Sequence, residues 1–126
     1  MLQIRPQQEA ALTELAIKSF EGRLADHLTA HFPEDTKVQG EEGVRRLIRE
    51  GIERAARYGI EAEYDVARFV DLQYILAPDF DTNPEIPWAA AILKAPDLDA
   101  TKRLDRLYER TEAELKKLAD QEGKGG

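Results

Sequence analysis

The sequence predicts an all-α fold, a single-domain bundle of four longer helices and one short helix. Apolar residues recur at intervals of three and four along four long stretches, as they do on one face of a helix. No run alternates apolar and polar residues for long enough to indicate a strand. Short polar, Pro- or Gly-containing segments separate these stretches, and such connections favour antiparallel neighbours in a bundle.

The first expected helix extends from Pro6 to about His31. Pro6 suits the first helical position, where its missing N–H has no intrahelical partner. Pro33 ends the helix because it disfavours helical backbone at the residue before it. One face carries Ala16, Ile17, Phe20, Leu24, His27, Leu28 and His31. The opposite face carries Glu14, Lys18, Glu21 and Ala25. Residues 33–40 are expected to form a polar connection.

The second expected helix spans about Glu41 to Tyr58. Its apolar stripe consists of Val44, Leu47, Ile48, Gly51, Ile52, Ala55 and Tyr58. Because Gly51 lies in the middle of this stripe, another helix is expected to cross there at close range. Gly59 predicts a left-handed C-terminal cap, with Ile60 as the apolar residue that follows it.

The third expected helix, about Ala62 to Leu76, is apolar around most of its circumference. This pattern is typical of the buried centre of a domain. Gln73 lies in the main apolar face, so it is expected to need hydrogen-bond partners from neighbouring elements.

A proline-rich connector, residues 76–88, follows the third helix and holds three of the six prolines and the only tryptophan. It leads into a short helix from about Ile86 or Pro87 to Lys94, which Pro96 closes.

The last expected helix runs from about Ala100 to Gln121, with Asp97 or Asp99 as its cap. Its stripe consists of Ala100, Leu104, Leu107, Tyr108, Thr111, Leu115 and Leu118. The sequence thus predicts one helical domain over residues 1–121 and a disordered tail over residues 122–126.

Composition excludes several classes of function. The chain of 126 residues has no cysteine, which excludes thiolate catalysis, cysteine zinc sites and disulfides and fits a reducing compartment. A formal net charge of −7 repels phosphate backbones, so nucleic-acid binding is not expected. The N-terminus lacks the pattern of a signal peptide, and no apolar run reaches the roughly 18 residues of a membrane span. We therefore expect a cytoplasmic protein that binds neither nucleic acid nor membrane.

The connector partly matches a calcium-binding EF-hand loop. Asp79, Asp81 and Asn83 stand at its positions 1, 3 and 5, but Pro84 replaces the required glycine and Ala90 the final acid. The preferred interpretation is a turn in which Asp79 and Asp81 accept backbone N–H groups. Asn83 is then expected to cap a helix that Pro84 begins.

The two histidines, His27 and His31, have the spacing that places two imidazoles over one metal ion. No glutamate follows the first histidine as in a zinc protease, and no third ligand is evident. Both residues lie in the apolar arc, so they are expected to be packed core or interface residues. No metal and no cofactor is predicted.

Catalytic patterns are also weak. Ser19, the only serine, lacks a Gly-x-Ser-x-Gly setting, and Gly40 and Gly43 flank two glutamates that would repel a phosphate. Two carboxylates could flank a substrate, but in a chain with 25 acids most belong to solvated helix faces. The protein is therefore expected not to be an enzyme, with no catalytic residue assigned.

Trp88 has two interpretations. It could anchor a partner protein, because tryptophan is enriched in binding hot spots, or it could lock the connector onto the third helix. The second interpretation is favoured, because tryptophan is buried on average. The candidate partner-binding residues are Trp88, Phe80, Asp79 and Asp81.

Several motifs resemble a known group of proteins. They are the run GEEGVRRLIREGIERAARYGI at 40–60, EYDVARFVDL at 63–72, DFDTNP at 79–84 and PWAAAIL at 87–93. With FExR at 20–23, HL at 27–28 and HFP at 31–33, they cover most of residues 4–108. In this order they resemble small helical proteins encoded in type VI secretion gene clusters of Gram-negative bacteria, near spike-tip and effector genes.

The resemblance implies a gene neighbourhood and brings no set of catalytic residues. It implies an adaptor or chaperone that loads an effector or spike-tip protein from the same gene cluster. The alternative is an immunity protein that neutralises a cognate effector. A third hypothesis, from the residues, is a small hydrolase that uses carboxylates around residues 63–85.

Overall fold

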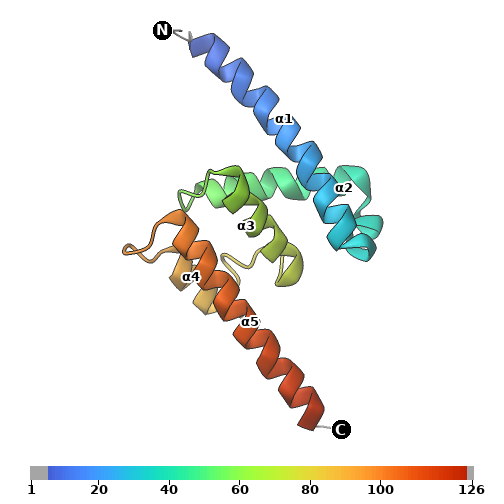
Figure 1. Ribbon diagram of the computed structural model, residues 1–126, viewed down its shortest axis with the longest axis vertical. Helices are drawn as coiled ribbons and strands as arrows, with labels where there is room; N and C mark the ends of the chain where they lie inside the picture. The colour runs from blue at the N-terminus through green and yellow to red at the C-terminus, as the bar shows by residue number, and fades with distance from the viewer. Residues whose placement is uncertain (1–5, 125–126) are drawn as a thin grey trace. The chain divides into compact units, whose positions relative to one another are not determined.

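The computed structural model describes residues 6–124, with side chains described over residues 14–122. Across this range the chain forms five helices and no strand, which confirms the all-α class. The helices are α1 Pro6–His31, α2 Pro33–Ala56, α3 Glu63–Ile75, α4 Pro87–Leu93 and α5 Ala100–Lys124 (Figure 1). Each expected helix is present, and the largest difference lies at the start of α2.

Contacts within the chain group it into two compact units, Met1–Glu50 and Gly51–Gly126. The first unit holds α1 and most of α2. The second holds the end of α2 together with α3, α4 and α5. A single domain over residues 1–121 stays a prediction.

The interior of the first unit follows the apolar faces expected for its two helices. Its buried apolar side chains are Phe20, Leu24, Leu28, Val44, Leu47 and Ile48. The N-terminal end of the α1 face is exposed, with Ile17 at 39%. His31 at the other end of this face is exposed as well.

Glu21 is buried, so its expected place on the solvent face of α1 was wrong. Its side chain is 6% exposed, and its Oε1 accepts a hydrogen bond of 2.9 Å from Nε of Arg49 on α2. A buried carboxylate needs such a partner to offset its desolvation. Periodicity could not indicate this pair, because the two residues are 28 positions apart.

Residues 33–39 are helical, so the expected polar connection was wrong. Pro33 takes the first helical position, and the carbonyl of Phe32 accepts hydrogen bonds from the Thr36 amide and hydroxyl, at 3.0 and 2.8 Å. Pro33 and the acids of the first turn start a helix even in a polar sequence. Gly40 interrupts it with φ 75° and ψ 166°, a conformation open to glycine, and thereby kinks α2.

The interior of the second unit is built around α3, as its apolar circumference predicted. The buried residues of α3 are Asp65, Val66, Phe69, Val70, Leu72 and Gln73. Other elements add Ala55, Ile60, Phe80, Ala89, Leu93, Leu104 and Leu107. The rings of Phe69 and Phe80, both fully buried, have centroids 4.8 Å apart.

The end of α2 crosses α3 at Gly51, which confirms the expected close approach. A Cβ atom at Gly51 would lie 2.5 Å from Oε1 of Gln73 and 2.7 Å from Cγ2 of Val70. Gln73 donates through Nε2 to the carbonyl of Pro78 at 2.8 Å, so it has the partner expected from a neighbouring element. Only glycine allows the two helices this separation.

Gly59 ends α2 as predicted. Its φ is 73°, its amide donates to the carbonyl of Ala56, and the amide of Ile60 donates to the carbonyl of Ala55. These two bonds form a Schellman cap. Ile60, the expected apolar follower, is fully buried.

Arg103 ties two connections of the second unit to α5. It donates to the carbonyl of Tyr58 at 2.8 Å and to that of Ala95 at 2.9 Å. Asp99 caps α5 by accepting the amide of Lys102 at 2.9 Å, which decides between the two expected caps.

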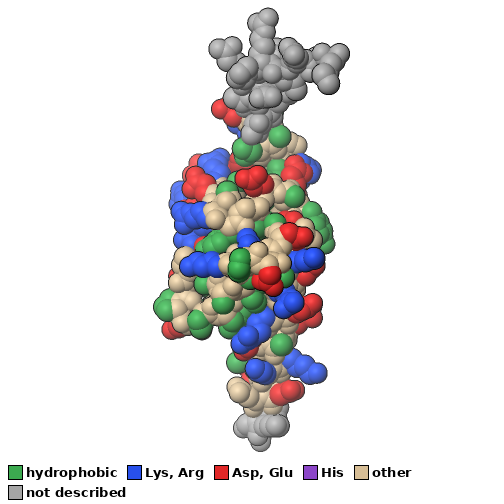
Figure 2. All heavy atoms as spheres, turned by 90° about the vertical axis from the view of Figure 1, so that its left-hand side faces the viewer, with side chains coloured by type: hydrophobic (Ala, Val, Ile, Leu, Met, Phe, Trp, Pro, Cys, Tyr) green, Lys and Arg blue, Asp and Glu red, His purple; other side chains and the backbone are tan. Residues whose placement is uncertain are grey.

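Helix α5 extends to Lys124, so residues 122–124 of the expected tail are helical, and residues 125–126 lie outside the described range. Figure 2 shows basic and acidic side chains close together along the C-terminal part of α5. None of the helices in the described range combines the length and apolar character needed to cross a membrane.

Candidate functional site

The connector between α3 and α4 is a series of turns that satisfies its own backbone. The amide of Phe80 donates to the carbonyl of Ala77 at 3.0 Å. The amides of Thr82 and Asn83 both donate to the carbonyl of Asp79, at 2.9 Å each. These turns position Phe80 and Asp81 toward the interior and leave Asp79 at the surface.

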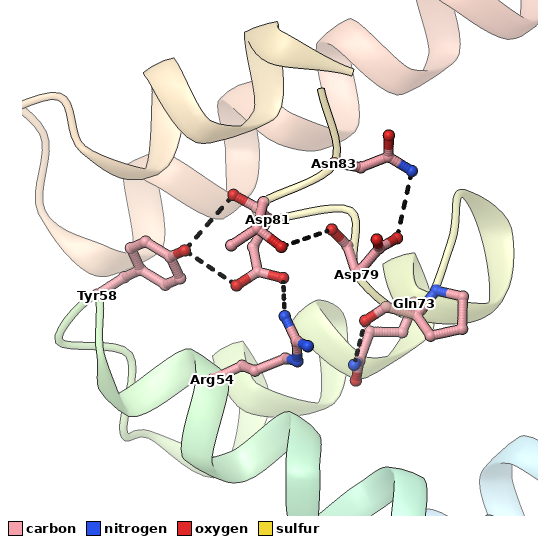
Figure 3. Close-up of polar contacts among 8 residues, drawn as sticks. Arg54, Tyr58, Gln73, Asp79, Asp81 and Asn83 are labelled. Carbon is pink, nitrogen blue, oxygen red and sulfur yellow. Dashed lines mark hydrogen bonds and ion pairs between the residues drawn. The ribbon is translucent and has the colours of Figure 1, made fainter. Parts of the chain in front are cut away.

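Asp81 is the centre of a buried polar cluster (Figure 3). Its carboxylate is fully buried and accepts hydrogen bonds from Nη1 of Arg54 at 2.7 Å and from the hydroxyl of Tyr58 at 2.9 Å. The expectation that Asp81 accepts backbone N–H groups in the turn was therefore wrong. Its partners are Arg54 in the last turn of α2 and Tyr58 in the turn that follows the helix, so Asp81 fastens the connector to the end of α2.

The cluster also changes the acidity of its tyrosine. Burial, together with the hydrogen bond to Asp81 and its charge, raises the pKa of Tyr58 to about 12. A negative phenolate beside a buried carboxylate is unfavourable, so the hydroxyl stays protonated and remains a donor.

Asp79 and Asn83 form a surface turn. The Asn83 amide group donates through Nδ2 to Oδ1 of Asp79 at 3.2 Å, and its Oδ1 accepts the amide of Glu85 at 2.9 Å. The expected helix beginning at Pro84 was wrong, because α4 begins at Pro87. Asn83 thus stabilises a two-residue turn in which its side chain replaces a backbone acceptor.

Asp79, Asp81 and Asn83, which match part of a calcium-binding loop, do not direct their side chains to one common point. The carboxylate of Asp81 is directed to Arg54 and Tyr58, away from Asp79. In the part of the chain that the structure describes, no three His, Cys, Asp or Glu side chains are grouped to hold a metal ion.

The histidine pair lies in the first unit with ring centroids 4.2 Å apart. Nδ1 of His31 forms a hydrogen bond of 2.9 Å with the carbonyl oxygen of His27. This bond occupies one of the two ring nitrogens of His31 and orients its ring along α1.

Trp88 lies between core and surface. Its side chain is partly exposed, and the guanidinium carbon of Arg110 on α5 lies 5.2 Å from the centroid of its ring. Arg110 also donates to Glu114 at 2.8 Å. Trp88 therefore packs toward α5, and its remaining exposed part is available for contact.

The four candidate partner-binding residues thus separate into two pairs. Phe80 and Asp81 are fully buried and serve the interior of the second unit. Asp79 and Trp88 reach the surface. Partner binding at these residues stays a prediction.

A second polar cluster was not found from the sequence. The guanidinium of Arg68 on α3 lies over the rings of Tyr64 and Tyr108, at 5.4 and 5.0 Å, and bonds Asp105 at 2.7 Å. Tyr64 and Arg68 stand one helical turn apart, a spacing that puts them on the same face. Only the packing of α3 on α5 brings Tyr108 and Asp105 to them.

No protein-family model matches this chain, and no curated protein or solved structure shows significant similarity to it.

Proposed function

We propose that this protein is a non-enzymatic adaptor or chaperone that binds an effector or spike-tip protein of a type VI secretion system. The link to secretion rests on the sequence motifs described above. The protein-binding role rests on one structural observation, the apolar stripe of α5.

This stripe changes from buried to exposed along a single helix face. Leu104 and Leu107 are fully buried and Thr111 is 3% exposed, all in the interior of the second unit. On the same face, Leu115 is 47% and Leu118 56% exposed. The apolar stripe of α5 therefore continues beyond the part of the helix whose side chains are buried. Amphipathic helices with such faces bind partner proteins by burying them.

The first unit has a comparable feature at α1. Ile17 is 39% exposed, whereas Phe20, one turn further on the same face, is buried. Both units thus present leucine or isoleucine side chains on a helix that also contributes to a core. Exposed apolar residues in both units favour a protein partner.

The Asp81 carboxylate supports a structural role for this residue over the hydrolase hypothesis. The Asp81 carboxylate has no exposed surface and is held by Arg54 and Tyr58. A general acid or base must reach the proton it transfers, directly or through a water molecule.

Co-expression with the effector and spike-tip proteins encoded beside its gene tests the proposal. A stable complex in gel filtration is expected with one of them. Glutamate at both Leu115 and Leu118 should abolish the complex, whereas Lys116→Glu, on the exposed side of the same turn, should leave it intact. Failure of the native chain to copurify with any of these proteins would argue against the proposal.

A gene deletion separates the adaptor from the immunity alternative. Loss of an adaptor blocks secretion of the effector while the cells stay viable. Loss of an immunity protein makes cells sensitive to the effector of their own kin.

A further inference from the structure

The two histidines of α1 form a pair at the surface of the first unit. Their ring centroids lie 4.2 Å apart, with the ring planes tilted by 33°. His31 is exposed and His27 is half-buried. Leu24 and Leu28, on the same face of α1, are both buried and fix this part of the helix in the interior of the first unit. The pair is therefore open to solvent and carried by a well-packed stretch of helix.

The hydrogen bond of His31 decides which of its nitrogens can bind a ligand. Its Nδ1 lies 2.9 Å from the carbonyl oxygen of His27. A carbonyl oxygen can only accept, so Nδ1 carries the proton and Nε2 of the neutral ring carries the lone pair. Histidines that ligate metals in proteins almost always donate their other ring N–H in this way. His31 thus already makes the supporting hydrogen bond of a metal-ligating imidazole.

The spacing of the two residues lets both rings reach one ion. Residues four apart on a helix lie beside each other on one face. Two imidazole nitrogens that each lie about 2.0–2.1 Å from a common ion are about 3 Å apart. Rings with centroids 4.2 Å apart can reach that separation by rotation about their own side-chain bonds. His27 can coordinate through one ring nitrogen while the other makes a hydrogen bond.

The position of the pair on the helix favours a cation. His31 is the last residue of α1, and the C-terminal end of a helix carries a partial negative charge. Glu34 and Asp35 follow within four residues, in the first turn of α2. On the other side, Arg23 lies one turn before His27, and its guanidinium carbon lies 5.9 Å from the centroid of the Phe20 ring. The formal net charge of −7 also attracts cations to the chain as a whole.

We propose that His27 and His31 form a two-histidine site for a divalent transition-metal ion. Imidazole nitrogens suit Cu²⁺, Ni²⁺ and Zn²⁺, whereas Mg²⁺ and Ca²⁺ prefer oxygen ligands. Among the described residues, no third His, Cys, Asp or Glu joins the pair, so water fills the remaining positions. The site does not depend on the proposed function, because both ligands belong to one helix of this chain.

Titration of the native chain with zinc or nickel chloride tests the class of ion. Calorimetry should detect binding of both ions, and magnesium chloride should bind far more weakly. In NMR spectra, Zn²⁺ should shift the imidazole resonances of both histidines, with the largest change at Nε2 of His31. Equal affinity for Mg²⁺, or a Zn²⁺ titration that leaves either imidazole unshifted, would overturn the proposal.

Substitutions then distinguish a shared site from two separate ligands. His27→Ala and His31→Ala should each weaken Zn²⁺ binding at least about tenfold, because the second imidazole no longer binds the ion held by the first. The matched control combines His31→Ala with Thr29→His, at an exposed position. It keeps two histidines but places them two residues apart, on different sides of α1. It should bind no more tightly than His31→Ala alone. Native affinity in the control or in either single variant would rule out a shared site.

Binding should also stabilise the folded chain. The two imidazoles share the ion only while α1 is helical, so the ion favours the folded state. Nickel chloride should therefore raise the unfolding temperature of the native chain, and His31→Ala should lose this rise. Circular dichroism without metal checks that the variant keeps its helical content. A rise of the same size in His31→Ala would mean that the ion binds elsewhere, and the proposal would be wrong.

Discussion

The carboxylate of Asp81 lies 2.7 Å from Nη1 of Arg54 and has no exposed surface. This ion pair joins the connector after α3 to the last turns of α2. Because Phe80 is the neighbouring residue and is buried against Phe69, the pair also keeps an aromatic side chain in the interior.

We predict that Asp81→Ala destabilises the protein by about 3 kcal/mol, because it leaves the Arg54 guanidinium without its buried partner. The value is at the low end for such pairs, since the Arg54 side chain keeps 27% exposure. Urea unfolding measures the change. Asp79→Ala, two residues away at the surface, is the control and should cost much less. Similar losses in both variants would contradict the role given to Asp81.

We predict that Gly51→Ala destabilises the protein although alanine favours helix. The added Cβ would lie 2.5 Å from Gln73 Oε1 and 2.7 Å from Val70 Cγ2, so α2 and α3 must separate. Overpacking of this kind costs about 1–3 kcal/mol. Gly22→Ala is the matched control, because no atom lies within 4 Å of its Cβ position. It should stabilise the protein by up to about 1 kcal/mol, the difference in helix propensity. Thermal unfolding of the two variants should therefore shift in opposite directions.

We predict that stability falls as the pH rises from about 10 to about 12. Folding raises the pKa of Tyr58 from 10.0 to about 12, so the protonated hydroxyl favours the folded state below pH 10. That contribution is lost as the pH rises through the folded value. Tyrosinate absorbance should show late-titrating tyrosines, and Tyr58→Phe should lose one of them while Tyr108, whose pKa burial also raises, remains. A Tyr58 that ionises near its ordinary value would refute this.

We predict that Arg110→Ala makes Trp88 more accessible to a soluble quencher. The guanidinium covers part of the indole ring, 5.2 Å from its centroid, and such contacts stabilise by about 0.5–1 kcal/mol at exposed sites. Trp88 is the only tryptophan, so its fluorescence reports this position alone. Arg106→Ala, one turn earlier on α5, should leave the quenching unchanged. Equal quenching in all three proteins would mean that Arg110 does not cover the ring in solution.

Much of the fold was predictable because it depends on neighbours in the chain. The Schellman cap at Gly59 and the close crossing at Gly51 both came from glycines placed within or just after an apolar stripe. The start of α2 was missed because its first turns are polar and give no periodic signal, although Pro33 at a first helical position is itself a helix-start signal.

The candidate site was predictable only in part. The connector was predicted to be a turn, but Asp81 was expected to accept hydrogen bonds from backbone N–H groups. Its carboxylate is held instead by Arg54 and Tyr58, more than 20 positions earlier in the chain. The spacing of four residues between Arg54 and Tyr58 is a signal that they share a partner, but it does not identify the partner.

The sequence by itself determined most of the helical segments, where most of the helices end, and which residues are apolar enough to be buried. These properties follow from backbone preferences and from interactions over three or four residues. Only the tertiary structure decided the partners of Glu21, Asp81 and Arg68, and which part of the α5 stripe stays exposed. Those outcomes depend on how helices distant in the chain pack. A buried charged group needs a hydrogen-bonding or oppositely charged partner, and the packing decides which residue is close enough to be that partner.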